Sequence, residues 1–270
     1  MCIMFGLTRR RREKLRRLPF PDTWRQYLKR RVPLYLRLSE EDRRELEGHI
    51  QVFLNEKRFE GCGGFTVTDE ARVVIAAQAC LLLLHRDAGY FPGLSSIVVY
   101  PTSFIVDLKD YDEVGVITEE TGPLAGESWD TGCVVLAWDE VLDSGADTDD
   151  GYNVVIHEFA HQLDAEGGIA DGVPILPTRA CSGRWMRVFR GEYRRLREKL
   201  EDGGQSVLDE YGATGPAEFF AVVTESFFEI PLRLQGEYPE LYDELRQYFR
   251  QDPAGWGEKV KGEFKKRSDL

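Results

Sequence analysis

The stretch NVVIHEFAHQLDAEGG, residues 153–168, decides how the chain is interpreted, because it places His157 and His161 four residues apart with Glu158 between them. Residues four apart on an α-helix project from the same face, so both imidazoles can reach a single metal ion. Glu158 lies one step around the helix, where it can take a proton from a metal-bound water without binding the metal. The spacing therefore predicts a catalytic zinc helix.

The alternative is a core helix in which two histidines share one face by chance. Most neighbours are apolar: Val154, Val155, Ile156, Phe159 and Ala160. Burying two imidazoles and a carboxylate among them is costly unless they share a partner. The chain also has only four histidines. We therefore favour a metal site, and expect one Zn²⁺ per chain.

Catalytic zinc takes three protein ligands and keeps an open position. His49 lies in a heavily charged segment and His85 closes a leucine-rich one, so the third ligand is expected to be a carboxylate. Asp164 is the near option, but a ligand three residues after His161 would crowd the coordination sphere. Asp164 is better placed to accept a hydrogen bond from a histidine N–H. Glu218 is the distant option.

Glu218 opens the apolar stretch PAEFFAVVTESFFE, residues 216–229, in which Glu225 and Glu229 share its helical face. Three glutamates on one stripe are also typical of the solvated side of an amphipathic helix. Because the zinc helix lacks a third ligand, Glu218 becomes the leading choice, and Glu225 is expected beside the ligands.

The composition indicates a soluble globular chain of 270 residues, with 42% hydrophobic residues. The longest apolar run, residues 73–84, is too short to span a bilayer. Five scattered cysteines without a C-x-x-C pair fit reduced thiols. The first residues do not have the order of a secretory signal. We therefore expect a cytoplasmic location and no membrane partner.

Charge is distributed unevenly along the chain. Residues 1–31 contain eleven Lys/Arg and two acids, whereas the remainder contains 24 and 45. This basic arm is either a solvated helix that docks on the acidic body or a contact for nucleic acid or an anionic membrane. No aromatic residue interrupts the basic run at 9–17, and the acidic body would repel phosphates. We favour docking, and expect a basic arm at 1–31 followed by one domain at 32–270.

Helix starts are predicted from capping residues and first-turn prolines. They lie at Ser39, Thr68, Asp149–Asp150, Ser182, Pro216 and Pro239. Short strands are predicted over 95–107, broken at Pro101, and over 132–142. Helices before and after a few strands predict an α+β domain, mostly helical with a small mixed sheet.

Several blocks resemble the bacterial Mlc titration factor A family of zinc peptidases. They are VVIHEFAHQLDAEGGIADGVPIL, LDEYGATGPAEFFAVVTESFF and LYDELRQYFRQDP, supported by VVYPTSFIV and ESWDTGCVVLAWDEVL. The family's catalytic site is similar to that of the anthrax lethal factor protease. The resemblance implies a zincin-like metallopeptidase fold whose cleft lies beside an edge strand, expected within residues 132–138.

Carried over by motif, the resemblance implies His157, His161 and Glu218 as zinc ligands and Glu158 as the base. It also implies that Tyr211 faces the substrate carbonyl, although a turn-flanking aromatic is the simpler interpretation of that residue. The implied activity is peptide hydrolysis, and the resemblance favours aminopeptidase action over endopeptidase action. The acidic segment 107–150 would attract a free amino terminus, or is simply solvated.

A binding protein is the alternative function. The resemblance implies that the Escherichia-type member sequesters a sugar-responsive transcription repressor, which a zinc site kept for structure alone would permit. A purely structural site has no use for Glu158 at the base position. The sequence therefore favours an enzyme, with a peptide as substrate and a repressor as a second candidate partner.

Overall fold

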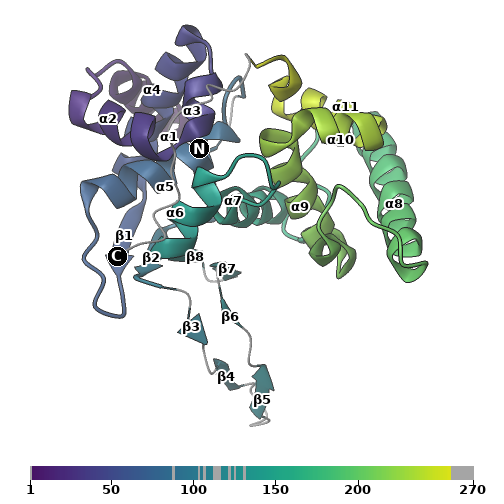
Figure 1. Ribbon diagram of the computed structural model, residues 1–270. Helices are drawn as coiled ribbons and strands as arrows, with labels where there is room; N and C mark the ends of the chain where they lie inside the picture. The colour runs from purple at the N-terminus through teal and green to yellow at the C-terminus, as the bar shows by residue number, and fades with distance from the viewer. Residues whose placement is uncertain are drawn as a thin grey trace.

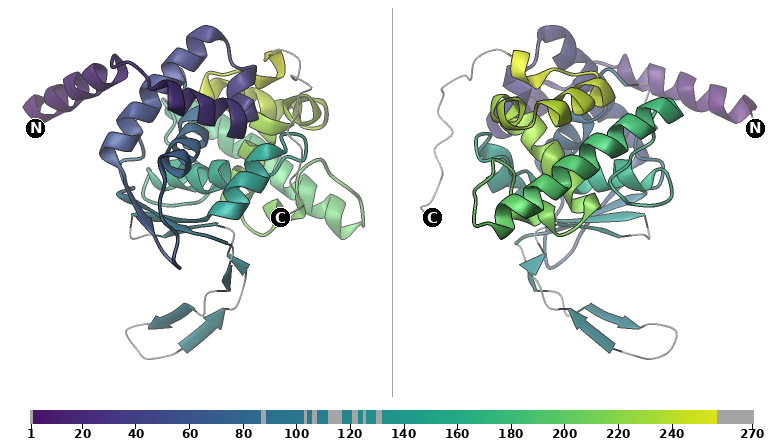
Figure 2. Two further views of the ribbon diagram at one scale, coloured as in Figure 1. Left: turned by 60° about the vertical axis from the view of Figure 1, so that its left-hand side comes forward. Right: turned by 90° about the vertical axis from the view of Figure 1, so that its right-hand side faces the viewer.

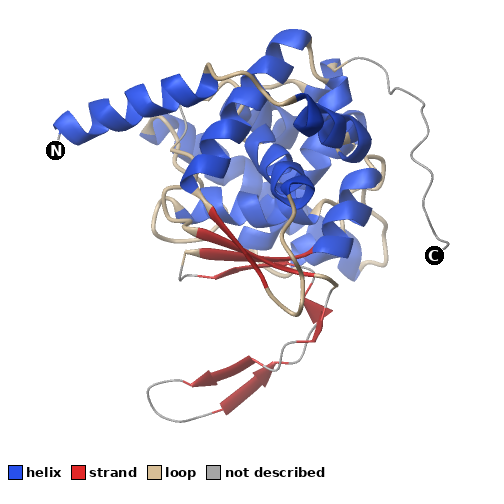
Figure 3. Cartoon of the chain, turned by 90° about the vertical axis from the view of Figure 1, so that its left-hand side faces the viewer, coloured by secondary structure: helices blue, strands red, loops and turns tan. Residues whose placement is uncertain are grey.

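The computed structural model describes residues 2–86, 89–102, 104–105, 108–111, 117–120, 123–124, 126–129 and 132–256. In this part of the chain the helices gather on one side of a small sheet (Figure 3). The N-terminal helices α1–α5 and the C-terminal helices α8–α11 flank a central helix, α7, as Figure 1 shows. The opening motif is thus carried between the two groups of helices.

The main sheet has four strands, in the order β1-β2-β8-β7. They are β1 (Arg58–Gly61), β2 (Ser96–Tyr100), β8 (Cys133–Ala137) and β7 (Gly126–Trp129). β1, β2 and β8 run parallel, and β7 pairs antiparallel with β8. The predicted α+β class with a small mixed sheet is confirmed.

Between β2 and β7 the chain forms a ribbon that extends from the sheet (Figure 1). Its strands are β3 (Phe104–Ile105), β4 (Leu108–Tyr111), β5 (Ile117–Glu120) and β6 (Pro123–Leu124), with β3 paired to β6 and β4 to β5. The predicted break at Pro101 is confirmed, because β2 ends at Tyr100. Part of the acidic segment 107–150 lies outside the described residues.

The expected edge strand at 132–138 is wrong, because β8 is paired on both sides and the edges of the described sheet are β1 and β7. The predicted strand over 132–142 also ends earlier. Helix α6 (Trp138–Ala146) begins directly after it, with Asp139 and Glu140 in its first turn. Acidic side chains there are favoured by the helix dipole, which explains the switch from strand to helix.

The N-terminal helices are α1 (Cys2–Arg16), α2 (Asp22–Arg31), α3 (Pro33–Arg37), α4 (Glu40–Glu56) and α5 (Asp69–Leu81). Two predicted caps are confirmed: Ser39 Oγ accepts from Asp42 N, and Thr68 Oγ1 accepts from Ala71 N. The apolar run of α5 is fully buried. Within the described residues, no helix is long and apolar enough to cross a bilayer.

The basic arm contacts the body through one side of α1. Arg12 makes two hydrogen bonds of 2.8 Å to the Glu56 carboxylate, and Arg16 Nη2 lies 3.4 Å from Glu45 Oε1. These ion pairs agree with the docked-helix interpretation. The start of α1 extends beyond the body (Figure 2). Phe20 and Leu28 are buried in the core, so the later part of the arm packs with the rest of the chain.

The C-terminal half contains α7 (Val154–Ala165), α8 (Arg179–Glu201), η1 (Glu210–Ala213), α9 (Pro216–Glu229), α10 (Pro231–Glu237), α11 (Pro239–Phe249) and η2 (Pro253–Gly255). Pro216 and Pro239 begin α9 and α11 as predicted. The chain has a further short helix, α10, that was not predicted.

Two predicted caps are wrong by a few residues. Asn153, not Asp149 or Asp150, caps α7 by accepting from Ile156 N. Asp150 instead accepts from Tyr152 N in the turn before the helix. Thr178, not Ser182, caps α8. Several residues of capping type precede α7, whereas Ser182 lies inside the first turn of α8. In both cases the residue with extended backbone at the boundary acts as the cap.

Candidate metal centre

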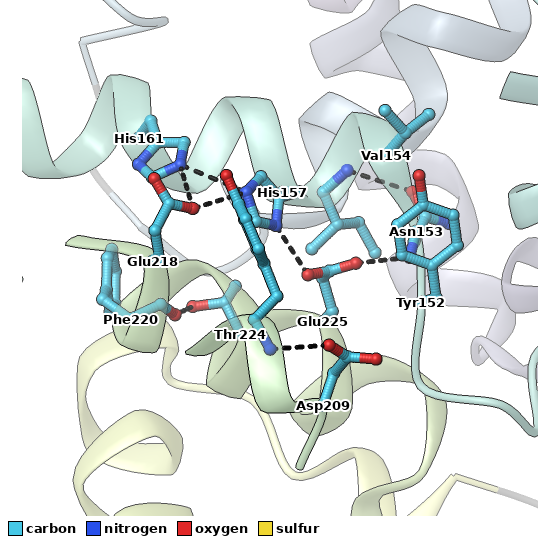
Figure 4. A network of polar contacts seen from close by, with 12 residues as sticks. Tyr152, Asn153, Val154, His157, His161, Asp209, Glu218, Phe220, Thr224 and Glu225 are labelled. Carbon is cyan, nitrogen blue, oxygen red and sulfur yellow. Dashed lines mark hydrogen bonds and ion pairs between the residues drawn. The ribbon is translucent and has the colours of Figure 1, made fainter. Parts of the chain in front are cut away.

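Two helices bring the three predicted ligands together: α7 carries His157 and His161, and the first turn of α9 carries Glu218 (Figure 4). The two Nε2 atoms lie 3.2 Å apart, and Glu218 Oε2 lies 3.0 Å from His157 Nε2 and 3.2 Å from His161 Nε2. Tetrahedral zinc with bonds of about 2.0–2.1 Å separates its ligand atoms by about 3.3 Å. The three atoms therefore match one face of a zinc coordination tetrahedron.

The sequence around Glu218 explains its position. Pro216 fixes the first helical residue of α9, and Gly215 before it is extended. Phe219 and Phe220 are buried on the opposite side, which anchors the turn in the core. Glu218 is thus held at the N-terminus of α9 and faces α7, with a quarter of its side chain exposed.

Glu225, two turns further along α9, supports His157 from behind. Its Oε1 lies 2.7 Å from His157 Nδ1, and its Oε2 accepts a hydrogen bond from Asn153 N at 2.6 Å. A carboxylate on Nδ1 fixes the tautomer and orientation of an imidazole, and leaves Nε2 for a metal. Burial raises the pKa of Glu225, although the contact with His157 favours its charged form.

The carboxylates make the site strongly favourable for positive charge. Burial alone would lower the pKa of His157, but hydrogen bonds to Glu218 and Glu225 raise it to about 10. Burial would likewise raise the pKa of Glu218, but the two histidines lower it to about 2. A metal would displace the imidazole protons, because histidine binds metal only in its neutral form.

Glu158 occupies a different environment from the other carboxylates. It is 5% exposed, and its buried Oε2 makes no hydrogen bond within the described residues. Burial raises the pKa of Glu158 to about 7. A carboxylate with such a pKa can both accept and return a proton near neutral pH.

Tyr211 lies at the rim of the centre, in η1. Its ring centroid is 5.9 Å from that of His157, and the residue is 53% exposed. Asp209 Oδ1 accepts from Tyr211 N and holds the start of η1. The phenol therefore lies at the exposed rim of the site, beside His157.

The structure contradicts the predicted role of Asp164. This residue is fully buried, but its Oδ2 accepts a hydrogen bond from Gly172 N at 2.8 Å, and its Oδ1 makes none within the described residues. Asp164 does not accept from His161. Its side chain turns toward the loop after α7, which Trp185 also holds by donating to Gly172 O.

Sequence reasoning missed Asn153, although an asparagine directly before an apolar helix was an available capping signal. One other group in the described residues has metal-type ligand atoms close together: Asp42, Glu45 and His85. His85 Nε2 lies only 2.6 Å from Asp42 Oδ1, and Nδ1 lies 2.9 Å from Arg250 O. Burial lowers the pKa of His85, but hydrogen bonds to the backbone carbonyl of Arg250 and to Asp42 raise it, so its protonated form is favoured and this group is an ion pair.

Two histidines one turn apart, a glutamate from a second helix and a buried carboxylate with one oxygen that makes no hydrogen bond among the described residues define a metallopeptidase type of centre on an α+β fold. The comparisons agree. Residues 7–250 match the family model for the glucose-regulated metallo-peptidase M90, and the chain belongs to this family.

Individual relatives cover most of the chain. An uncharacterised protein of Synechocystis sp. is 45% identical over 244 residues, which cover 90% of this chain and 89% of that protein. Mlc titration factor A of Salmonella agona is 32% identical over 226 residues, covering 83% and 84%. That of Klebsiella pneumoniae is 33% identical over 233 residues, covering 85% and 86%. The resemblance to the Mlc titration factor A family is confirmed, and metallopeptidase family membership implies a metal ion.

Proposed function

We propose that this chain is a zinc-dependent peptidase, with His157, His161 and Glu218 as the metal ligands. The observation that carries the proposal is the triangle of two Nε2 atoms and one carboxylate oxygen, with sides of 3.0 to 3.2 Å. These three atoms belong to two imidazoles and one carboxylate, a ligand set typical of a catalytic zinc site. Zinc bound there would supply a Lewis acid and a water of lowered pKa.

The remaining residues handle the proton and the substrate. Glu158 takes the proton of the attacking water and returns it to the leaving amine. Tyr211 donates a hydrogen bond to the carbonyl oxygen as negative charge develops on it, an interaction worth about 3–4 kcal/mol when well aimed. Glu225 keeps His157 oriented throughout. A cytoplasmic location is part of this proposal.

Within this function we favour aminopeptidase action on short peptides, on the strength of the family resemblance and of the acidic composition of segment 107–150. Amino-acid anilides and their N-acetylated forms provide the comparison. Cleavage of the free-amine substrates alone supports aminopeptidase action. Equal cleavage of the acetylated forms assigns endopeptidase action instead.

The peptidase proposal is tested with Glu158→Gln. The variant is expected to retain one zinc per chain and to lose hydrolysis by about 10²–10⁴-fold, because the amide cannot accept the proton. Metal analysis and anilide cleavage, each with a chelator control, are the measurements. Wild-type rates in this variant would refute the mechanism.

Glu218→Ala tests the ligand set separately. Loss of the third ligand should abolish stoichiometric zinc binding, while Glu158→Gln keeps it. A full zinc complement in Glu218→Ala would assign the third ligand to another residue.

A second candidate function is binding of a transcription repressor, favoured by the relatives named Mlc titration factor A. Zinc-loaded Glu158→Gln, which keeps the site but not the activity, is the suitable bait for a pull-down from host lysate. Recovery of a repressor supports this role. Its absence from the bound proteins argues against it and leaves the peptidase proposal intact.

A further inference from the structure

Asn153 has an unusual position at the junction of three helices beside the metal centre. It is 1% exposed and lies directly before α7, facing Gln78 of α5 and Glu225 and Glu229 of α9. Figure 4 shows it next to Glu225, on the side of His157 away from Glu218. Nothing in the proposed function uses this residue.

Every polar group of Asn153 has a partner. The backbone N–H donates to Glu225 Oε2 at 2.6 Å, and the backbone carbonyl accepts from His157 N at 2.9 Å. The side-chain Oδ1 accepts from Ile156 N at 3.0 Å, which caps α7.

The two donors of Nδ2 reach the neighbouring helices, at 2.8 Å to Gln78 Oε1 and 3.0 Å to Glu229 Oε1. A helix cap needs only an acceptor, so aspartate, serine or threonine would serve equally well for that task. The amide donors are what asparagine adds.

These contacts determine where Glu225 can lie. Glu225 and Glu229 are four residues apart on α9, so both carboxyl groups face the start of α7. Asn153 holds each one with a different N–H, and His157 Nδ1 contacts the remaining oxygen of Glu225 at 2.7 Å. A shift of Asn153 would therefore move Glu225, and with it the direction of His157 Nε2.

We propose that Asn153 is a positioning residue of the metal centre, which fixes Glu225 against His157 by bridging α7 to Gln78 and Glu229. This inference rests on the proposed zinc site. It concerns metal affinity and ligand orientation, so it can be tested without measuring peptide cleavage.

Asn153→Ser retains a side-chain acceptor for the cap but removes both bridging donors. We expect its zinc dissociation constant, measured by competition with a chelator of known affinity, to rise by about tenfold, the lower end for residues that orient metal ligands. The absorption spectrum of the cobalt-substituted protein should change as His157 reorients.

Ser144→Ala is the matched control. Ser144 Oγ accepts a hydrogen bond from Val154 N at 3.2 Å, so this variant also loses a contact to the start of α7, but none to either glutamate. It should be destabilised without a change in zinc affinity or cobalt spectrum. An equal loss of affinity in both variants would reduce Asn153 to a structural role and overturn the proposal.

Reversing the direction of the hydrogen bond between Asn153 and Glu229 provides a second test. Asn153→Asp keeps the cap but removes both donors and places a second carboxyl group against the buried Glu229, so zinc binding should weaken. Adding Glu229→Gln supplies a donor to the new aspartate and should restore most of the affinity. No recovery in the double variant, although it unfolds cooperatively, counts against the bridge.

The two levels of the proposal fail differently. A wild-type protein that binds no zinc would refute the zinc site itself. A wild-type protein that binds zinc with the same affinity and cobalt spectrum as Asn153→Ser would refute only the positioning role.

Discussion

Glu158 and Glu225 are both buried carboxyl groups next to His157, yet their surroundings give them different chemistry. Both oxygens of Glu225 are held, one by His157 and one by the backbone of Asn153. Glu158 keeps a buried oxygen that makes no hydrogen bond in the described structure. A fully held carboxylate orients its neighbours, whereas one with an unused oxygen is available for proton transfer.

Tyr211→Phe tests the substrate side of the site. The ring remains beside His157 but the hydroxyl is lost, so zinc content should be unchanged while kcat falls by about 10²–10³-fold, the range for one oxyanion donor. Steady-state kinetics and metal analysis are the measurements, with Tyr27→Phe in α2 as the control. A kcat close to wild type would return Tyr211 to the simpler role of a turn-flanking aromatic.

For single residues, the sequence predicted which side chains meet at the site better than it predicted the direction of each side chain. Helical spacing alone requires His157 and His161 to share a face, and the site geometry agrees. Asp164 lies three residues after His161 on nearly the same helical face, so its side chain could turn toward the histidine or toward the loop that contains Gly172. Its hydrogen bond to Gly172 N depends on a loop whose path no local pattern specifies, so the predicted contact with a histidine was wrong.

Among the secondary-structure elements, the loop after α7 contacts both helices that carry the predicted ligands, α7 and α9. Asp164 and Trp185 hold Gly172 from α7 and α8. Gly172 has φ of +78°, and a Cβ there would lie 2.5 Å from Pro216 O, at the start of α9. The loop therefore packs closely against the turn that carries Glu218.

Gly172→Ala should disturb this packing in two ways. The positive φ costs about 1–3 kcal/mol for a residue with a Cβ, and the clash with Pro216 should shift the first turn of α9 and weaken zinc binding. Gly168→Ala is the control, because Gly168 has φ of +93° but no atom near its Cβ position. Urea unfolding measures the loss of stability in each variant, and zinc titration measures the loss of metal affinity. Equal zinc affinities would show that the loop does not position Glu218.

Element boundaries were predictable where one local signal dominates. Ser39 and Thr68 lie directly before a helical pattern and cap α4 and α5, and Pro216 and Pro239 are the first residues of α9 and α11. The switch from β8 to α6 was missed because VVLAWDEVL contains apolar residues at both strand and helix spacing. The sequence placed the edge at β8 because it did not show that β8 has partners on both sides. β8 pairs locally with β7, and it pairs with β2 over a long separation in the chain, as between Ser96 and Cys133. The second pairing is not encoded in the local pattern of either strand.

At the scale of the whole molecule, Glu45 connects parts of the chain that are distant in sequence. Its carboxylate contacts Arg16 of α1, His49 Nε2 within α4 at 3.2 Å and the backbone N–H of His85 after α5 at 3.2 Å. The hydrogen bond from His49 is the largest influence that lowers the pKa of Glu45 to about 2, against burial. The charged form is therefore favoured in the folded protein.

This shift predicts acid sensitivity. The folded-state pKa lies below the usual glutamate value of about 4.3, so the stabilisation is complete above that value and is lost as the pH falls toward 2. Glu45→Gln should lower the free energy of unfolding near pH 6, and the difference from wild type should shrink below about pH 4. Glu41→Gln, at an exposed position of α4, is the control. A difference that is independent of pH would exclude the charge of Glu45 as the cause.

The separation of the ligands along the chain also sets an order of assembly. Glu218 comes 57 residues after His161, so during synthesis both histidines leave the ribosome well before the glutamate. A nascent chain that ends before α9 has only the two histidines of the proposed ligand set, and two imidazoles alone bind a divalent ion weakly. With the proposed ligand set, tight metal binding would wait until α9 has docked on α7, so an incomplete chain would lack the proposed peptidase activity.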